Sequence, residues 1–508
     1  MSLLSAFNNG ETMSWTQAML SVAAAVFFWC VVSSIMAWYE LRHVPGPFLA
    51  SFSYVWSFWA TYTGHSNQIF SEAQKYYGKV MRIAPDAISI FDPETLFRIN
   101  SPRSHYTRSL WYQNARLDHR GDSVLTMLDT PSHNKRKAKL APAFSGKNVA
   151  VLETKLDTWL AALMQTIRDK IAKGEGIMEI GVLIQYFQLD LITDLSMGRP
   201  WGNLKADKDH FGYMQMTKTA IPSLQIWILL PFARKIFMSS WFLRLFAPKP
   251  TDNEGLGLFL GVLDNAVKSR LSGMTEKPKD NRDILDVWIE HGHTEDECQR
   301  DLAILVPAGA DTSVMMMRGT LLLLMSTPVA YWRLKQEIRD AISNGRISTP
   351  VTSEEAKSLE YAQAVVHEGF RIMVPINSGF PKRVPESGDI ICGVPIRGGT
   401  DVYTNYESLM RCEEVFGKDP DIFRPERFLG GGPEVAYRLK VLDFAFGGGH
   451  FTCLGKTLAI LEMNKIFIEL FRYFDFQVTR PEKPWSREAY LTWVVRDFWA
   501  RVTEDTSI

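Results

Sequence analysis

An uninterrupted apolar run near the start of the chain, from Ala18 to Trp38, contains no charged side chain. A helix of about 20 such residues spans the hydrocarbon core of a membrane, which is about 30 Å thick. A cleaved signal peptide is the alternative, but its apolar core is about 7–15 residues long and follows basic residues, which this chain lacks before the run. Arg42 and His43 follow the run and favour a cytosolic location for the remainder. We therefore predict a single-pass transmembrane anchor at residues 18–38, after a short N-terminal segment at residues 1–17.

Two prolines follow the anchor, in the sequence HVPGPF, and neither can continue a helix. Residues 39–50 are therefore predicted to form a stiff hinge. Beyond the hinge there is no low-complexity linker and no repeat at solenoid spacing. The glycines of GLGLFLG, at residues 255–261, have the wrong spacing for a dinucleotide-binding loop. We expect residues 51–508 to form one large domain without a nicotinamide or flavin site.

The charge balance and the cysteines exclude several classes of protein. Lysine plus arginine and aspartate plus glutamate each number 56, so the formal net charge is zero, which is not the electrostatic footprint of a nucleic-acid-binding protein. The 5 cysteines are scattered and form no Cys-x-x-Cys pair, so a structural zinc site and a disulfide framework are both disfavoured. A small-molecule or membrane setting, facing a reducing compartment, fits best.

Helical patterns dominate the predicted domain. In the longest, Thr294 and Glu297 form a capping box before a stretch that is apolar on nearly all sides, which indicates a helix buried in the centre of the domain. Pro307 and Gly309 interrupt this stretch, so we expect a kink or a loosened turn there. Strand-like pieces such as DAISIF, ICGVPI and TDVYT are few and short. The fold class predicted is mainly α with small β-sheets.

The sequence FAFGGGHFTCLG places Cys453 behind three consecutive glycines and in front of a long apolar helix. Glycines let backbone N–H groups turn towards a sulfur atom, and the N-terminus of a helix adds positive potential, so both favour a thiolate. A buried structural cysteine at a helix start is the alternative. These residues resemble the haem-binding loop of the cytochrome P450 family, Phe-x-x-Gly-x-Arg-x-Cys-x-Gly, which Phe446, Gly449, Cys453 and Gly455 match.

One position of this loop departs from the family pattern. The arginine two residues before the cysteine is replaced by Phe451, and His450 lies one residue earlier. Some fungal members resemble this variant. The resemblance leaves open which side chain contacts the haem propionate on that side, and we take His450 as the candidate.

Within the long helix, AGADTS places Asp311 and Thr312 among apolar residues, where polar groups are costly unless they are bonded or functional. An isolated threonine would usually bond a carbonyl four residues earlier. The stretch resembles the oxygen-activation turn of the P450 family. The resemblance implies that Thr312 hydrogen-bonds the bound oxygen and that Asp311 relays protons.

Two further motifs follow in the family's order. Glu368 and Arg371, in VVHEGFR, lie on one helical face, although Glu-x-x-Arg is frequent by chance and contributes little on a surface. Together with Arg427, in FRPERF, they resemble the buried Glu-Arg-Arg triad that braces the haem side of P450 domains. We assign Glu368, Arg371 and Arg427 that structural role.

Basic residues elsewhere are candidates for the haem propionates. His133 and Lys137 lie one helical turn apart, and Lys382 and Arg383 follow each other in FPKRV. The resemblance implies that His133 and Lys137 bind the propionates, with Lys382 or Arg383 contributing from a strand. A solvated basic surface is the alternative.

The resemblance covers nearly all of the chain and implies a single cytochrome P450 domain that binds haem b through the Cys453 thiolate. The implied activity is monooxygenation of an apolar small molecule with O₂ and electrons from NADPH, delivered by NADPH–cytochrome P450 reductase with cytochrome b5 as a second donor. Lys456 and residues 136–139 are candidates for the basic docking face of the reductase, and solvated lysines are an equal interpretation. The implied location is the endoplasmic reticulum membrane, with the haem domain in the cytosol.

The segment from Leu224 to Phe246 is either core or a lid that lies in the bilayer interface, and the resemblance favours the lid. The motifs are closest in character to fungal members near the pisatin demethylase group, which implies secondary metabolism. Rival functions are isomerisation or dehydration by a thiolate-bound haem without external O₂, and haem binding without catalysis. The Asp311–Thr312 pair argues against the first rival.

Overall fold

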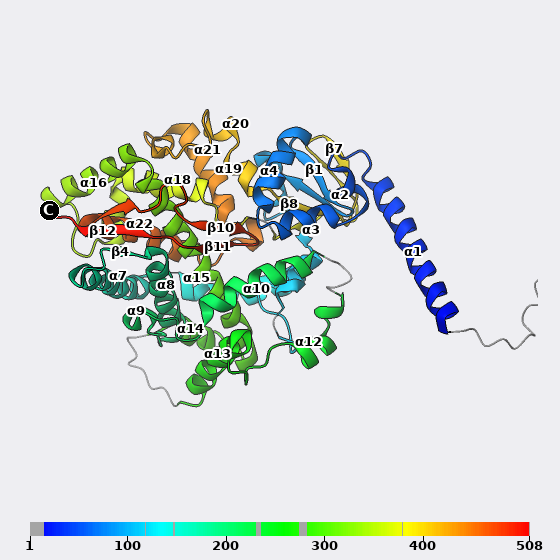
Figure 1. Cartoon of the computed structure of the whole chain (residues 1–508), viewed down its shortest axis with the longest axis horizontal. Coiled ribbons are helices and arrows are strands. Elements are labelled where there is room, and N and C mark those ends of the chain that lie inside the picture. The colour runs from blue at the N-terminus through cyan, green and yellow to red at the C-terminus, as the bar shows by residue number, and fades with distance from the viewer. Residues whose placement is uncertain are drawn as a thin grey trace, which may run out of the picture.

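The computed structural model describes residues 15–116, 118–145, 148–229, 235–273, 282–377 and 379–506. Within these ranges the protein is mainly helical, with four small sheets, as predicted. Helix α1, Trp15–Glu40, stands apart from the body of the molecule, which Figure 1 shows clearly. Part of the predicted N-terminal segment, and residues 230–234 of the predicted lid, lie outside the described residues.

The core is built around α15, Glu295–Met325, which crosses the centre of the body. It packs against α8 (Ile180–Met197), α18 (Glu360–Ile372) and α22 (Lys456–Tyr473), and α8 in turn packs against α7 (Asn148–Ala172). Most side chains of α8 and α22 are buried, in agreement with their nearly continuous apolar sequences. The other helices and the small sheets pack beside this bundle, and the sheet that contains β1 and β8 lies on the side next to α1 (Figure 1).

Helix α15 begins at the predicted capping box. Thr294 Oγ1 accepts from the Glu297 backbone N–H, and the Glu297 carboxylate accepts from the Thr294 N–H. Of the kink or loosened turn predicted at Pro307 and Gly309, the loosened turn is not found, because α15 is a single α-helix through both residues, and the kink stays a prediction. Gly309 has a packing role instead: a Cβ there would lie 2.8 Å from Ile192 Cδ1, so glycine lets α8 approach α15 closely.

The largest sheet has the strand order β1-β2-β8-β5-β3, formed by Val80–Ala84, Ala87–Ile90, Asp401–Thr404, Lys382–Arg383 and Thr107–Arg108. Strands β3 and β5 pair antiparallel, and Arg108 lies opposite Lys382. Since these two residues come from segments far apart in the sequence, only the folded sheet brings their basic side chains together.

The remaining strands form three small sheets: β4-β12-β9 (Ile177–Met178, Ala500–Glu504, Phe474–Val478), β10-β11 (Ser486–Ala489, Trp493–Arg496) and β6-β7 (Asp389–Ile391, Val394–Ile396). The remaining α-helices are α2 (Phe48–Phe52), α3 (Val55–Tyr62), α4 (Ser66–Tyr77), α5 (Pro93–Ile99), α6 (Thr130–Leu140), α9 (Asn203–Ala206), α10 (Tyr213–Ile228), α12 (Ser240–Phe246), α13 (Gly255–Leu271), α14 (Ile284–Glu290), α16 (Pro328–Ser343), α17 (Ser353–Ser358), α19 (Tyr406–Met410), α20 (Glu413–Phe416) and α21 (Gly432–Leu442). Short 3₁₀ helices lie at η1 (Leu110–Ala115), η2 (Ala141–Phe144), η3 (Pro425–Phe428), η4 (Asp443–Phe446) and η5 (Gly449–Phe451).

Helix α1 is long and apolar enough to span a membrane, and none of its residues is buried in the protein. Further large apolar side chains are exposed on α2 and α3, where Phe48 and Trp59 are examples, and on α12, where Trp241 and Phe246 are examples. The predicted bounds of the anchor and hinge, 18–38 and 39–50, fall within α1 and the segment that follows it, and the predicted domain division stays a prediction.

The C-terminal end of α1 is held by a buried arginine of the large sheet. The Arg82 guanidinium donates to the carbonyl oxygens of Ala37 at 2.8 Å and Trp38 at 3.3 Å, and to that of Pro85 at 2.8 Å. Arg82 is fully buried, and carbonyl oxygens at the end of a helix lack partners within the helix. The anchor helix is therefore joined directly to strand β1.

Candidate active site

A central cavity of about 340 Å³ lies between α15 and the loop that contains Cys453. Its walls are mostly apolar, and its polar residues include Cys453 on one side, Thr312 and Glu462 from two buried helices, and Arg108 and Lys382 from the large sheet. The cavity thus joins, in one space, residues that come from distant parts of the chain.

Cys453 is held by the glycine loop in the way its sequence predicts. Its backbone N–H donates to the Phe446 carbonyl oxygen at 2.8 Å, which closes the loop. Gly449 has φ +59°, and a Cβ there would lie 2.1 Å from the Asn100 carbonyl oxygen, so glycine is required. Gly455 caps the start of α22, and its Cα is close enough that a Cβ would contact the Cys453 sulfur at 3.8 Å.

The electrostatics of Cys453 differ from the sequence-based expectation. Cys453 is exposed to the central cavity. Loss of contact with bulk water raises the pKa of its thiol, although the backbone N–H groups of Gly455 and Lys456 and the Lys137 ammonium favour the thiolate. A bound metal ion would favour the thiolate further, because a coordinating thiol is deprotonated by the charge of the metal.

A group of basic side chains surrounds the Phe451 ring, at the position where the family pattern has an arginine. The Arg108 guanidinium lies 4.6 Å from the ring centroid, the Lys382 ammonium 3.8 Å, and the His133 ring 4.9 Å. Because an aromatic face attracts cations, the uncharged Phe451 ring stabilises the basic side chains that lie around it. Lys137 lies beside this group and donates to the carbonyl oxygens of His450 at 2.9 Å and Thr452 at 2.6 Å.

Arg108 is the member of this group that sequence reasoning missed. It is buried, its Nη1 donates to three carbonyl oxygens between residues 124 and 127, and its Nε has no acceptor. Burial lowers its pKa to about 10. Burial, together with the charges of Arg108 and Lys137, lowers the pKa of Lys382 to about 7. In the part of the chain that the structure describes, no carboxylate forms an ion pair with Arg108, Lys137 or Lys382.

Two of the predicted propionate residues point elsewhere. Arg383 is the neighbour of Lys382 on a strand and therefore faces the other side of the sheet; its guanidinium lies 3.7 Å from an Asp401 carboxylate oxygen. His450 uses both ring nitrogens, which lie 3.1 Å from Asn134 Nδ2 and 3.0 Å from the Pro102 carbonyl oxygen. Of the predicted group, Lys382 lines the cavity, whereas His133 and Lys137 lie directly behind Phe451.

On α15, the two predicted residues have different surroundings. Thr312 lines the cavity, and its hydroxyl donates to the Ala308 carbonyl oxygen at 2.7 Å, the local bond common for a threonine in a helix. Asp311 accepts from Tyr213 Oη at 3.1 Å and Gln185 Nε2 at 3.4 Å. Burial raises the pKa of Asp311 to about 6, although both hydrogen bonds oppose the shift.

A second buried acid, Glu462, faces the cavity from α22. Its carboxyl group accepts from Ser313 Oγ at 2.7 Å and Gln188 Nε2 at 3.3 Å, and Gln188 also donates to the Gly309 carbonyl oxygen at 3.2 Å. Burial raises the pKa of Glu462 to about 7. The sequence carried a signal for it, since Glu462 is an acid within the apolar stretch TLAILEMNKIF. Helix α8 thus donates a hydrogen bond to each acid, from Gln185 to Asp311 and from Gln188 to Glu462.

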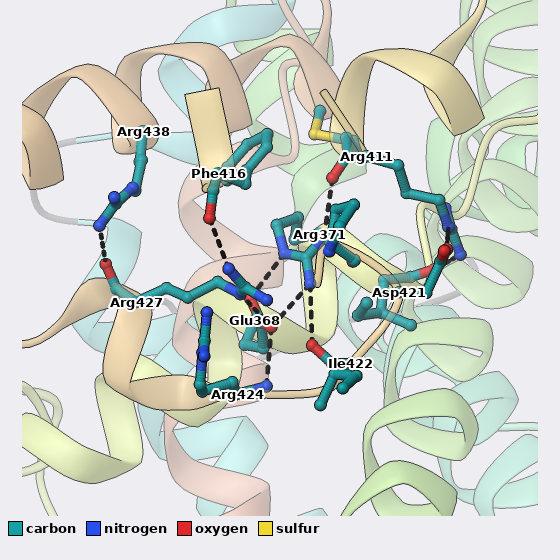
Figure 2. A network of polar contacts seen from close by, with 12 residues as sticks. Glu368, Arg371, Arg411, Phe416, Asp421, Ile422, Arg424, Arg427 and Arg438 are labelled. Atoms are coloured by element: carbon teal, nitrogen blue, oxygen red, sulfur yellow. Dashed lines mark hydrogen bonds and ion pairs between the residues drawn. The ribbon is translucent and has the colours of Figure 1, made fainter. Parts of the chain in front are cut away.

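The three residues predicted to form a triad come together in a fully buried network (Figure 2). Arg371 donates twice to Glu368, with both N–O distances 2.7 Å, and Arg427 Nε lies 3.4 Å from Glu368 Oε1. The Arg424 backbone N–H also donates to Glu368, at 2.8 Å. Arg371 Nη1 donates to the carbonyl oxygen of Met410 at 2.8 Å. The network ties α18 to the segment between α19 and η3.

These residues fit an iron porphyrin. Among the described residues there is no group of three or more His, Cys, Asp or Glu side chains that could hold a metal ion, so a metal beside Cys453 must arrive with most of its ligands. The apolar walls suit a macrocycle, and the unpaired charges of Arg108 and Lys382 with the orphaned Arg108 Nε suit its anionic edge. The fold and the site fit the class of proteins that bind haem iron through cysteine.

The comparison with known proteins identifies the family. The cytochrome P450 family model matches residues 45–495. A cytochrome P450 monooxygenase ABA1 of Pyricularia oryzae is 34% identical over 502 residues, covering 96% of this chain and 97% of the relative. A cytochrome P450 monooxygenase aba1 of Botryotinia fuckeliana is 35% identical over 471 residues, covering 91% of this chain and 92% of the relative. The chain belongs to the cytochrome P450 family, and its similarity to these fungal enzymes makes it an oxygen-incorporating oxidoreductase.

Proposed function

We propose that this chain is a membrane-anchored monooxygenase that oxidises an apolar small molecule of secondary metabolism, using O₂ and electrons from NADPH. The observation that carries the proposal is the meeting of Cys453 and Thr312 in the walls of one apolar cavity. A haem bound there by a cysteine thiolate supplies the electron density that favours cleavage of the O–O bond. The protein binds the substrate, excludes water and manages protons.

The proton-handling groups are Thr312 and Asp311. The Thr312 hydroxyl lies in the cavity wall and can donate to an oxygen atom beside it when its bond to Ala308 is exchanged. The Asp311 carboxyl group, held by Tyr213 and Gln185, takes up and releases a proton near neutral pH because its pKa is about 6. Glu462 accepts from Ser313 on the same helix, and its carboxyl group can also exchange a proton near neutral pH because its pKa is about 7.

Asp311→Asn is expected to separate stability from turnover. The pKa of Asp311 is raised from about 4 to about 6 on folding, so the folded state binds more protons than the unfolded state between these values, and stability falls as the pH rises through them. Above about pH 6.5, ionisation of Asp311 has lowered the free energy of unfolding by about 3 kcal/mol relative to its value at low pH. The variant should therefore be at least as stable as the natural protein at pH 7.5, with the gain shrinking towards pH 4, while turnover falls about 100-fold. Urea denaturation at several pH values and product formation measure both effects. A variant that is destabilised at pH 7.5 would contradict the stability prediction.

The anionic edge of the haem is assigned to Arg108 and Lys382, with His133 and Lys137 behind Phe451. Arg108→Gln is expected to speed the transfer of haem to an excess of apomyoglobin about tenfold, because a charge-assisted hydrogen bond is lost. Arg383→Gln is the matched control, since it removes the same charge from the paired strand but from its other face. Equal transfer rates for both variants would show that Arg108 does not hold the haem.

The membrane assignment rests on α1 and on the exposed apolar residues of α2, α3 and α12. We assign the protein to the endoplasmic reticulum membrane with the haem domain in the cytosol, where NADPH–cytochrome P450 reductase, with cytochrome b5 as a second donor, supplies electrons. The expected docking face needs correction at Arg136, because this side chain is buried and pairs with Asp301 at 2.6 Å and with Glu297. Lys139 and Lys456 remain candidates.

Reconstitution tests the proposed function. The purified full-length protein in lipid nanodiscs is reduced and exposed to carbon monoxide, then mixed with the reductase, NADPH and a panel of apolar compounds in ¹⁸O₂. We expect the Soret band of thiolate-bound iron and a product that carries one ¹⁸O atom. Product formation without NADPH and without ¹⁸O would instead establish an isomerase or dehydratase. A haem spectrum with no product from any compound would favour haem binding without catalysis.

A further inference from the structure

A second cavity, of about 440 Å³, lies against the N-terminal part of α15. Its walls come from residues 115–116 and 118–123, from residues 243–251, from α13 and from the first turns of α15. We call this cavity the vestibule. Ile304 belongs to the walls of both the vestibule and the central cavity. A molecule bound in the vestibule therefore lies next to the central cavity, with one side chain of α15 bordering both.

The vestibule contains one buried donor without a partner, on Arg300. Arg300 lies in its wall on α15, and its guanidinium is packed against the Gly121 backbone, where a Cβ would be 3.3 Å from Arg300 Cζ. The Arg300 Nε is buried and has no acceptor, whereas most buried donors in proteins find one. Arg244 and Lys249 line the same cavity but are exposed. Within the described residues no carboxylate lies within ion-pair distance of Arg300.

The carboxylates of the vestibule offset only part of its positive charge. Asp118 pairs with Arg120 at 2.6 Å, and Arg120 also pairs with Asp296 at 2.8 Å, outside the vestibule wall. Although burial opposes the shift, the hydrogen bonds from Arg120 and the more distant charge of Arg300 lower the pKa of Asp118. Asp264 is buried, and burial raises the pKa of its carboxyl group. The vestibule thus has mostly apolar walls and more cations than carboxylates.

The position of Arg300 limits the length of a ligand that reaches both cavities. Thr312 follows Arg300 by twelve residues on the same helix, so their Cα atoms are about 18 Å apart. With carbon–carbon bonds of about 1.5 Å, an extended chain of about twelve carbons covers most of that distance.

We propose that the vestibule binds the carboxylate of an amphipathic acid through Arg300, while the apolar part of the same molecule extends past Ile304 into the central cavity. The proposal rests on the proposed function, since it specifies which class of apolar substrate this monooxygenase accepts: one with a carboxylate at the end remote from the oxidised carbon. Arg300 orients the substrate and selects it, and the residues around Thr312 contact the carbon that reacts.

Lauric acid and methyl laurate are the probes, because they differ in charge and share one twelve-carbon chain. Their binding to the full-length haem protein in nanodiscs is followed by the ligand-induced shift of the Soret band. Arg300→Gln should raise the dissociation constant of lauric acid about tenfold and change that of methyl laurate less than twofold. Since each probe is compared between variants, its own partitioning into lipid cancels. Arg300→Lys, which keeps the charge, should recover part of the affinity for the acid.

The matched control is Lys268→Gln, which removes an exposed charge from α13 one turn after Asp264 without altering the vestibule wall. It should leave both probes unaffected. The proposal is overturned if Arg300→Gln weakens the binding of the acid and of the ester equally, if it weakens the binding of neither, or if lauric acid does not bind the natural protein. Failure of the proposed function is seen separately, as the absence of the thiolate Soret band with carbon monoxide before any probe is added.

Discussion

Replacing Cys453 by serine is expected to abolish the Soret band of thiolate-bound iron and to lower monooxygenase turnover by three orders of magnitude or more. The fold holds this sulfur atom at the wall of the central cavity through the bond from its backbone N–H to Phe446 and through the closely packed glycines of the loop. A serine oxygen keeps the size of the side chain but does not donate electron density as a thiolate does. Losses of this size are usual when a group that acts directly in catalysis is removed.

Cys392→Ser is the control for this experiment, because Cys392 is an exposed free cysteine that does not line the cavity. Both variants are purified with haem, reduced and exposed to carbon monoxide, and circular dichroism verifies that each is folded. A thiolate band that persists in Cys453→Ser would refute the assignment of the iron ligand. A loss of the band in both variants would point to general damage and would contradict it as well.

Arg371→Met is expected to lower the free energy of unfolding by about 3–5 kcal/mol, the largest stability effect that we foresee for a single side chain. Glu368 would then remain fully buried without the two hydrogen bonds that Arg371 donates. The carbonyl oxygen of Met410 would also lose its donor. Since Arg427 approaches the same carboxylate only at 3.4 Å, it cannot replace Arg371 (Figure 2).

Lys75→Met provides a matched control for this second prediction. Lys75 and Glu72 have the same spacing along a helix as Arg371 and Glu368, but both side chains are about two-thirds exposed, at 67% and 69%. Exposed ion pairs contribute about 1 kcal/mol or less. Urea denaturation followed by circular dichroism measures both variants. If both variants lost a similar free energy of unfolding, burial would not make the Glu368–Arg371 pair more important for stability than an exposed pair.

Features encoded locally in the sequence could be predicted. The capping box of Thr294 and Glu297 needs only residues three apart, and the glycine loop around Cys453 needs only its own backbone. The triad was also accessible, because the order of its motifs resembles the family pattern even though the contact itself is long-range. Two local expectations need correction. Gly309 allows the close approach of α8 and does not form a looser turn, and the surroundings of Cys453 raise the pKa of its thiol.

Features that depend on strand pairing or helix packing could not be predicted. Arg108 reaches Phe451 only because β3 pairs with β5, and no local pattern marks it. The same pairing separates Lys382 from Arg383, since neighbours on a strand face opposite sides. Tyr213 and Gln185 meet Asp311 from two other helices. The types of residue in a site can be predicted from the sequence. The tertiary structure decides which members of a basic cluster face the cavity.

The bonds from Arg82 to the end of α1 have a consequence for how the enzyme sits on its membrane. Because the guanidinium holds the carbonyl oxygens of Ala37 and Trp38, the tilt of the anchor is transmitted to the large sheet, and the anchor is not a loose tether. A bilayer of different thickness would therefore rotate the whole catalytic body relative to the lipid surface. A shortened, water-soluble version of the enzyme should begin before residue 37, so that this arginine keeps both oxygens.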